Sequence, residues 1–582
     1  VRVRYDSRKN EYSVTPLVLY VKGNIVPDGT TVEYAGNGVW RSEVDMNEGY
    51  VFLFSDKYFY FAFNNSDELA VKRLSGSRDK VAMASEGYSV ENIRLNRGTY
   101  TVSLDMNNYA FSLDAPIDEY KISVFGSSVA NGQGATDFHG YAYLYGNLMR
   151  TRYQRKQSDN PFTISGVSIG GNNTQNLLDR YDELIHDFGR YVIIGLSMGN
   201  EGIHEASDKQ ALMQKFSDNM QKIIRKVRED GKIPVVMNNY TRGDYTLDDY
   251  SYIKRMNLLI HEWDVPSVNT LGAIDDGTGK WATGYMADNA HPTTNGHNEF
   301  FYAMPPSLFD ALEDGKPQPV RDMSGGATLS GGDVIEFRGE NILHPFTVSI
   351  RFKGGDAGRL FTVENSAGSV IGQVDITADG TVRYTSYQGN QVEGNVSVDD
   401  GAWHTVTVSH YYAQKRVILY VDDSQAGELA ERLTPGKMTV GDASGSASRT
   451  LGELFFWRSA FNPEEVEALV SGRMLKSSLE IYSPLKELEA GEIANLAQSS
   501  NAAVFVKNTS SGIVGVEGNG YGQLSVGTSD HTITLSASSP VDVRVVTADG
   551  KEVFSGKVDG SADVGGLSSG LYVVNGRKVV LR

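Results

Sequence analysis

The chain has 582 residues, which is too long for a single hydrophobic core, so we expect about three to five domains. Its formal net charge of −18 argues against binding to a nucleic-acid backbone or an acidic membrane surface, because both would repel it. The chain contains no cysteine, which excludes disulfides, thiolate chemistry and cysteine-ligated zinc.

No apolar run reaches the ~18 residues that a membrane-spanning helix needs, so we expect no transmembrane segment. The chain opens with the charged run VRVRYDSRKN, in which no signal peptide is visible. A signal peptide is therefore either lacking or was removed before this numbering begins.

Residues 1–116 are typical of an antiparallel β-sandwich. Aromatic residues alternate with smaller or polar ones in VFLFSDKYFYFAF, residues 51–63. The stretch TYTVSLDMNNYAFSL, residues 99–113, predicts a hairpin whose turn lies at Met106-Asn107-Asn108. The pattern contains no catalytic grouping.

Residues 117–318 have a different pattern, in which short apolar runs alternate with helix-like segments. The clearest predicted helix covers 207–229, where apolar residues recur at three- and four-residue spacing. Such alternation predicts a parallel sheet covered by helices on both faces, with ligands bound at the carboxyl ends of the strands. The predicted strands are 122–125, 191–194, 233–237 and 258–260.

The remainder of the chain is again rich in strand patterns. Residues 325–484 contain GAWHTVTV, RVILYVDD and LGELFFWRSAFNPEEVEALV, which resemble a laminin-G-like, concanavalin-type jelly roll. Small and polar residues at 485–512 are interpreted as a linker. Residues 513–582 end in LSSGLYVVNGRKVVLR and resemble the carboxy-terminal sorting domain of proteins secreted by Bacteroidetes-type bacteria. An ordinary terminal β-domain is the alternative.

Four motifs lie in the region 117–318, and three of them fall at predicted strand ends or Gly-rich turns before helices. A serine at the end of a parallel strand presents its hydroxyl on a tight turn, and its own N–H points at the carbonyl that it attacks. The motifs are GSSVANG at 126–132, GGNNTQNLLDR at 170–180, GLSMGNE at 195–201 and DNAHPTTNGH at 288–297.

In order and spacing these motifs resemble the four conserved blocks of the SGNH, or GDSL-like, hydrolase family. The resemblance covers about residues 118–310 and implies a flavodoxin-like α/β/α fold and a serine ester hydrolase without a cofactor. It places the nucleophile at Ser128, the acid and base at Asp288 and His291, and the remaining block residues at Gly171 and Asn200. The family commonly has Asp where Ser127 stands and Asn-Asp where Asn200-Glu201 stands.

The resemblance implies a role for each residue. His291, oriented by Asp288, would take the proton of Ser128 during attack on an ester carbonyl. The N–H groups of Ser128 and Gly171 and the side-chain amide of Asn200 would receive the developing oxyanion. Each residue also has an ordinary structural interpretation: a Gly-Gly turn before a helix needs no function, and Asn200 could cap a helix or bridge two loops.

The sequence also contains a second candidate for the nucleophile. GLSMG at 195–199 is a literal G-x-S-x-G after an apolar strand, the nucleophile elbow of α/β-hydrolases. Ser197, Asp264 and His291 would then form the triad. We prefer Ser128, because the alternative leaves GSSVANG and the close Asp288–His291 spacing unexplained. The other histidines show no metal-ligand spacing, and His297 is expected to cap or pack at the start of a helix.

The β-modules predicted on both sides of the hydrolase region suggest an exported carbohydrate esterase that removes acetyl or similar groups from a polysaccharide. We expect a secreted, periplasmic or cell-surface protein whose β-domains bind glycan and whose partners exclude nucleic acid. A lipase or thioesterase is the enzymatic alternative. A surface glycan-binding or adhesion protein with an inactive hydrolase domain is the non-catalytic one.

Overall fold

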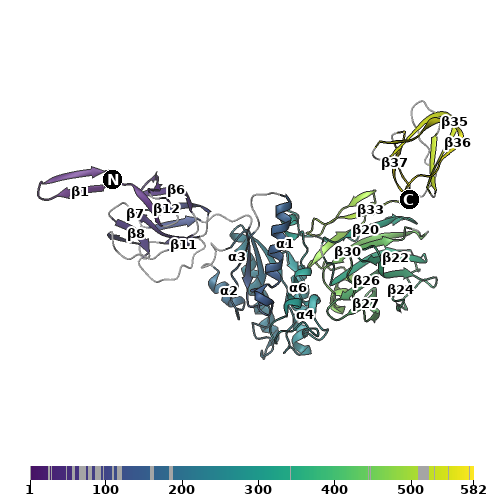
Figure 1. Cartoon of the computed structure of the whole chain (residues 1–582). Helices are drawn as coiled ribbons and strands as arrows, with labels where there is room; N and C mark the ends of the chain where they lie inside the picture. The colour runs from purple at the N-terminus through teal and green to yellow at the C-terminus, as the bar shows by residue number, and fades with distance from the viewer. Residues whose placement is uncertain are drawn as a thin grey trace.

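A computed structural model describes most of the chain, and every structural statement below concerns the residues that it describes. Figure 1 shows β-sheets at both ends of the chain and a helix-rich α/β unit between them. The described residues are 2–23, 26–27, 29–46, 49–55, 59–63, 74–76, 81–85, 93–95, 98–107, 110–114, 121–156, 163–181, 188–340, 342–354, 356–443, 445, 447–508, 524–529, 531–547, 550–575 and 577–581.

The N-terminal strands pair only in antiparallel fashion. A hairpin of β1 (Arg2–Asp6) and β2 (Glu11–Thr15) precedes two sheets. The first has the order β10-β8-β7-β3-β4 with β11 beside β7, and the second has the order β5-β6-β12-β13-β9. Asp105 pairs with Ala110, which confirms the predicted hairpin, although Asn108 in its turn lies outside the described residues. The strands not yet bounded are β3 (Leu19–Gly23), β4 (Thr31–Val32), β5 (Tyr34–Gly36), β6 (Val39–Met46), β7 (Gly49–Ser55), β8 (Phe59–Phe63), β9 (Leu74–Gly76), β10 (Val81–Ser85), β11 (Ile93–Leu95), β12 (Gly98–Asp105) and β13 (Ala110–Asp114).

The central unit is built on a five-stranded parallel sheet. Its order is β15-β14-β16-β17-β18, which is the flavodoxin-like order 2-1-3-4-5. Every pairing in it is parallel, as the alternation of strands and helices in the sequence predicts. The strands are β14 (Lys121–Gly126), β15 (Thr163–Gly166), β16 (Tyr191–Gly195), β17 (Ile233–Met237) and β18 (Ser267–Val268).

Helices cover both faces of this sheet because successive strand residues point to opposite sides. In β16, Ile193 belongs to the core formed with α1, α6 and α7, whereas its neighbour Ile194 belongs to the core formed with α2, α3 and α4. The predicted fold class, an α/β/α unit with all-β domains on both sides, is confirmed. The helices are α1 (Tyr141–Lys156), α2 (Thr174–Arg180), α3 (Lys209–Glu229), α4 (Leu247–Glu262), α5 (Leu271–Ile274), α6 (Thr294–Tyr302) and α7 (Leu308–Glu313).

One predicted strand of this sheet is wrong. The apolar run 258–260 lies inside α4, and the fifth strand is β18, which starts at Ser267. The run reads as a strand in isolation, but Ile253, Met256 and Ile260 are buried on one face at helical spacing. Thr246 starts the helix with a capping box, in which its hydroxyl accepts from the N–H of Asp249.

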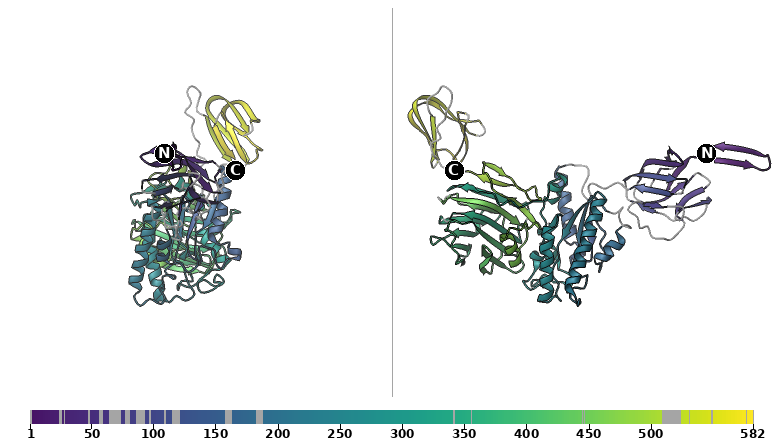
Figure 2. Two further views of the ribbon diagram at one scale, coloured as in Figure 1. Left: turned by 90° about the vertical axis from the view of Figure 1, so that its left-hand side faces the viewer. Right: turned by 180° about the vertical axis from the view of Figure 1, so that it is seen from behind.

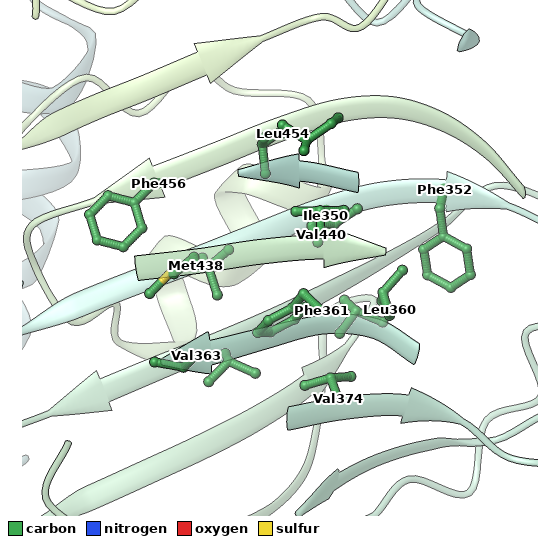
Figure 3. Close-up of a cluster of buried hydrophobic side chains, with 14 of the residues drawn as sticks. Ile350, Phe352, Leu360, Phe361, Val363, Val374, Met438, Val440, Leu454 and Phe456 are labelled. Atoms are coloured by element: carbon green, nitrogen blue, oxygen red, sulfur yellow. The ribbon is translucent and has the colours of Figure 1, made fainter. Parts of the chain in front are cut away.

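A two-sheet β-sandwich follows. A seven-stranded sheet has the order β19-β30-β21-β26-β27-β28 with β31 beside β30, and an eight-stranded sheet has the order β25-β24-β23-β22-β29-β20-β33-β32. Figure 3 shows side chains from both sheets, such as Phe456 and Met438, meeting in the core between them. The strands are β19 (Ala327–Leu329), β20 (Val334–Arg338), β21 (Phe346–Lys353), β22 (Gly358–Glu364), β23 (Val370–Ile376), β24 (Val382–Ser386), β25 (Gln391–Glu393), β26 (His404–Tyr411), β27 (Arg416–Val421), β28 (Ser424–Leu429), β29 (Lys437–Gly441), β30 (Arg449–Trp457), β31 (Leu479–Ser483), β32 (Gly491–Ile493) and β33 (Ala503–Val506), with the helix α8 (Pro463–Val470).

The segment 485–512 is not a linker over its described part, which contradicts the interpretation of its composition. β33 pairs with β20 and with β32, so the segment completes the eight-stranded sheet. Ala503 and Phe505 are buried in the sandwich core, while Val504 between them is less buried. β33 is short, and the small polar residues on both sides of it obscure its alternation of buried and less buried residues.

The sandwich and the α/β unit share a polar interface that is closed to solvent. Glu465 of α8 accepts hydrogen bonds from His261 at 2.9 Å and from the side-chain amide of Asn269 at 2.8 Å. A second buried pair joins His344 to Glu299 of α6 at 3.0 Å. Figures 1 and 2 show the two units side by side from opposite directions. Because buried charged groups need such partners, this interface fixes the two units to each other.

The chain ends in a separate antiparallel sheet with its own buried core. Its order is β34-β35-β37-β38 with β36 beside β35. In the part of the chain that the structure describes, no helix is long and apolar enough to cross a membrane. The strands are β34 (Leu524–Ser529), β35 (Thr532–Thr547), β36 (Glu552–Val564), β37 (Gly570–Val574) and β38 (Arg577–Leu581).

Candidate active site

The turn that follows β14 carries Ser128 at the carboxyl end of the parallel sheet. A tight turn forms because the N–H of Asn131 donates to the Ser127 carbonyl and the N–H of Gln133 donates to the Ser128 carbonyl, both at 3.0 Å. Gly126 is required where the turn begins, because a Cβ there would lie 2.3 Å from the carbonyl oxygen of Gly195 in β16. Ser128 is half-buried, so its hydroxyl is reachable from solvent.

The loop before α6 brings Asp288 and His291 to this serine. His291 Nε2 lies 2.9 Å from Ser128 Oγ, and His291 Nδ1 lies 2.8 Å from Asp288 Oδ1. An ionised carboxylate only accepts hydrogen bonds, so we assign the proton to Nδ1 and leave Nε2 to accept from the serine hydroxyl. The three side chains predicted from the sequence therefore form one continuous hydrogen-bonded relay.

The carboxylate of Asp288 is kept ionised by its neighbours. Burial acts to raise its pKa, but hydrogen bonds from the His291 side chain and the N–H of Ala290 outweigh this effect and lower the pKa below its usual value. The same carboxylate accepts from the N–H groups of Ala290 and His291 at 2.8 and 3.0 Å, which close a tight turn around it. The side chain of Asp288 is 59% exposed and that of His291 12%, so the relay lies at the molecular surface.

The predicted oxyanion donors lie in the two loops next to Ser128. Among the described residues, the backbone N–H groups of Ser128 and Gly171 donate no hydrogen bond, so both stay available to a ligand. The backbone of Gly170 lies close to the serine, since a Cβ built on Gly170 would be 3.8 Å from Ser128 Cβ. The side-chain amide of Asn200 donates to the Asn172 carbonyl at 2.9 Å, so Asn200 bridges the loops and retains its second N–H.

Two charged residues that the sequence analysis did not select fix these loops. Glu201 accepts from the N–H of Thr174 at 2.5 Å, in the first turn of α2, where the helix dipole favours a negative charge. Arg180 at the other end of α2 donates to the Asn172 side chain at 2.7 Å and to the Val167 carbonyl at 2.8 Å. The Glu at position 201, which departs from the family pattern, thus has a structural partner.

His297 connects α6, which follows the loop of Asp288 and His291, to the segment that follows Ser128. It is fully buried in α6, and its ring lies between the Gln133 carbonyl, 3.0 Å from Nε2, and the N–H of Tyr141, 3.4 Å from Nδ1. Burial lowers its pKa to about 4, so the ring stays neutral and can donate at one nitrogen and accept at the other. The expected packing role at the start of the helix is therefore correct, but it serves the loop that follows Ser128.

The β-sandwich contacts the segment that leads to Asp288. Gln414, in the turn between β26 and β27, donates its side-chain amide to the Asp275 carbonyl. Asp275 forms a β-bridge with Trp281, whose indole N–H donates to the Asn289 carbonyl at 3.0 Å. A chain of contacts thus runs from the sandwich to the residue next to Asp288, and no sequence pattern could have indicated it.

The alternative triad with Ser197 as nucleophile is not assembled in the structure. Ser197 is 1% exposed, and its hydroxyl lies 3.4 Å from the hydroxyl of Tyr245. Asp264 is a surface residue, 83% exposed, whose nearest charge is Arg228. In the described chain, no hydrogen bond or ion pair joins either residue to His291. The described residues also contain no group of three metal-ligating side chains.

The sequence model of the family described as "GDSL-like Lipase/Acylhydrolase family" matches residues 124–298. These residues hold the whole relay and the parallel sheet except the start of β14, so the chain contains a GDSL-like lipase/acylhydrolase domain. This part of the predicted resemblance is confirmed, and with it an ester hydrolase as the class of enzyme.

Solved structures similar to this chain include a psychrotrophic esterase from a Pseudoalteromonas species, with 19% identity over 34% of this chain and 97% of that one and a TM-score of 0.26. A lipase from a goat rumen metagenome shows 13% identity over 31% and 93%, with a TM-score of 0.26. A heptameric pentraxin from Limulus polyphemus shows 15% identity over 28% and 94%, with a TM-score of 0.23. No curated protein matches the chain.

Proposed function

We propose that this chain is a serine carboxylic-ester hydrolase that removes acetyl or similar small acyl groups from a polysaccharide. The observation that carries the proposal is the relay Asp288–His291–Ser128, with heavy-atom distances of 2.8 and 2.9 Å. A serine hydroxyl next to a neutral imidazole that a carboxylate orients is the arrangement that acyl transfer requires. Gly171 and Asn200 complete the proposed site.

The reaction follows from this arrangement. Ser128 Oγ attacks the ester carbonyl while His291 Nε2 takes the hydroxyl proton, and the carbonyl oxygen becomes an oxyanion. The N–H groups of Ser128 and Gly171 and the free N–H of Asn200 receive that charge. His291 then donates its proton to the leaving alcohol as the C–O bond breaks. Water attacks the acyl-enzyme by the same steps and restores Ser128.

The exposure of the site supports a polymeric substrate with small acyl groups. Asp288 is 59% exposed and Gly171 is exposed, so the described rim of the site is open to solvent at these two residues. A buried tunnel for a long acyl chain would need continuous apolar walls. Export to the cell surface and glycan binding by the β-modules stay predictions from the sequence.

A covalent labelling experiment tests the nucleophile, because a fluorophosphonate reacts with an activated serine. Trypsin places Ser128 on the peptide 122–150 and Ser197 on the peptide 191–209, so mass spectrometry separates the two serines. We expect the adduct on 122–150, with fragment ions that assign it to Ser128 rather than Ser127. An adduct on 191–209, or none in folded protein, would overturn the proposed mechanism.

The substrate is tested separately. We expect acetate release from acetylated xylo-oligosaccharides and little release of palmitate from 4-nitrophenyl palmitate. Preference for the long-chain ester would replace the carbohydrate esterase by a lipase, while the labelling result at Ser128 would still stand. Glycan binding without turnover of any ester would replace the enzyme by a binding protein.

A further inference from the structure

The loop before α1 and the first turn of α1 together expose three aromatic rings. Phe138 is 60% exposed and Tyr143 38%, and His139 between them is also exposed. The rings of His139 and Tyr143 stack with their centroids 3.8 Å apart and their planes within 2°. Large rings gain free energy when they are covered, so rings arranged at a surface in this way indicate a contact with a ligand or partner.

These rings line a pocket that also includes the nucleophile turn. The pocket has a volume of about 380 Å³, and its wall contains Ala130 and Asn131 as well as Phe138, His139 and Tyr143. Ligand sites usually occupy ~300–1,000 Å³, so the pocket is large enough for a small ring. Ala130 and Asn131 belong to the turn that carries Ser128, so the pocket borders this turn, although Ser128 itself is not part of its wall.

The lining of the pocket is mixed in character. Asn131 and Asp137 are exposed, and among the described residues their side chains have no hydrogen-bond partner. An acyl chain could not hydrogen-bond to these polar groups. A pyranose ring presents hydroxyls at its edge and C–H groups on its face, so it can hydrogen-bond to both side chains and pack on an aromatic face.

The loop is held in this conformation by contacts with α6. Asp137 and Phe138 have positive φ angles of 53° and 58°, which residues with a side chain rarely adopt and which cost free energy. The N–H of Thr136 donates to the hydroxyl of Thr294 at 3.0 Å, and the two contacts of His297 fix both ends of the segment 133–141. Strain at a fixed, exposed loop is typical of a binding site.

We propose that this pocket binds a pyranose ring of the polysaccharide next to the acylated position. Tyr143 and Phe138 supply the aromatic faces, and Asn131 and Asp137 hydrogen-bond to the ring hydroxyls. The inference rests on the proposed function, since it names the part of the substrate that this esterase recognises beyond the ester group.

The test compares two acetate esters in the full chain. One is an acetylated xylo-oligosaccharide, and the other is ethyl acetate, which has no ring to bind in the pocket. We expect kcat/KM for the oligosaccharide to fall about tenfold in Tyr143→Ala and in Phe138→Ala, mainly through KM, because aromatic stacking contributes about that factor. For ethyl acetate, kcat/KM should change less than about twofold in the same variants, because this ester has no sugar ring whose binding to the pocket could be lost.

Two further variants keep the test decisive. Tyr143→Phe retains the ring and should behave as the wild type, which separates stacking from a lost hydroxyl. Tyr387→Ala removes a 62% exposed tyrosine from the β-sandwich between β24 and β25, and should leave both activities unchanged. Circular dichroism checks folding.

Equal losses on both esters, or no loss on the oligosaccharide, would overturn the pyranose site while the esterase itself stands. A folded wild type that hydrolyses neither ester would overturn the proposed function, and this inference with it. The two failures are therefore distinguishable.

Discussion

Two serines stand at neighbouring strand ends of the same parallel sheet, and the structure treats them differently. Ser128 follows β14, is half-buried, and lies 2.9 Å from His291 Nε2. Ser197 follows β16 inside a literal G-x-S-x-G, but it is 1% exposed and lies next to Tyr245. The difference shows that a strand-end serine gains a base when another loop reaches it, whatever local motif surrounds it.

The turn at Ser197 is instead part of the core. The N–H of Met198 donates to the buried side chain of Asn239 at 2.7 Å, and the Ser197 hydroxyl accepts from the N–H of Gly199 at 3.3 Å. Burial raises the pKa of Tyr245, so its hydroxyl stays protonated and cannot act as a base for this serine. Variants at both turns and at the residues that support them test this contrast.

Ser128→Ala should have the largest effect. Removing the nucleophile of a triad lowers kcat by ~10⁴-fold or more, because the remaining groups cannot form an acyl-enzyme. Hydrolysis of 4-nitrophenyl acetate measures the loss, and an unchanged melting temperature shows that the fold is intact. Retention of more than about a tenth of the wild-type rate would place the nucleophile elsewhere.

Asp288→Asn should lower kcat on the order of 10³-fold. An amide at this position can donate to His291 Nδ1 and so favours the tautomer in which Nε2 cannot accept the serine proton. Because Asp288 is 59% exposed, we expect water to replace part of its function and the loss to stay below that of the serine variant. Equal losses in the two variants would contradict this ranking. The assay is the same ester hydrolysis at neutral pH.

Asn200→Ala should lower kcat by roughly 10²-fold, since one oxyanion donor contributes about that much. The same side chain bonds to the Asn172 carbonyl, so a purely structural role would reduce the melting temperature without a selective loss of kcat. Measuring both quantities separates the two roles of Asn200. A loss confined to KM would argue against an oxyanion role.

The parallel sheet could largely be predicted, because 122–125, 191–194 and 233–237 are apolar runs bounded by turn residues. The run 258–260 could not be separated from a helix, since three apolar residues fit either period. The strand β33 was missed because its pairing with β20 joins residues that are far apart in sequence. Pairing between two strands that are so far apart in sequence leaves no pattern in either strand alone.

The three relay residues of the candidate site could also be predicted, but the residues that support them could not. Ser128, Asp288 and His291 stand in motifs whose order resembles a known family, and the structure brings them together. Glu201 and His297 were missed as site-supporting residues, because their partners Thr174 and Gln133 lie 27 and 164 residues away. Polar residues that act through distant backbone atoms carry no signal in one sequence.

His297→Gln should change the pH dependence of stability around the Ser128 turn. Burial lowers the pKa of His297 from 6.5 to about 4, so below pH 6.5 the unfolded chain takes up a proton that the folded chain refuses. As pH falls from 6.5 to 4, the wild type should therefore lose the stability that the neutral His297 contributes, and its melting temperature should fall. The variant should lack this part of the pH dependence.

Asp275 acts in the opposite direction, because burial raises its pKa to about 7 and its protonation favours the folded state as pH falls. The difference between wild type and His297→Gln isolates the histidine, since Asp275 is common to both. Parallel melting-temperature profiles between pH 7 and pH 4 would show that His297 does not titrate as inferred.

Ser197→Ala should have the smallest effect, with kcat/KM within about twofold of the wild type, because no hydrogen bond among the described residues joins Ser197 to the relay. Within the described part of the chain, its hydroxyl has a weak contact with Tyr245 and one N–H donor, so the loss of stability should be about 1 kcal/mol. Ester hydrolysis and urea unfolding measure the two quantities on one preparation. A large loss of kcat with unchanged stability would give the G-x-S-x-G serine a chemical role and remove the contrast between the two turns. An unchanged kcat beside the inactive Ser128→Ala variant would assign the chemistry to the turn that His291 reaches.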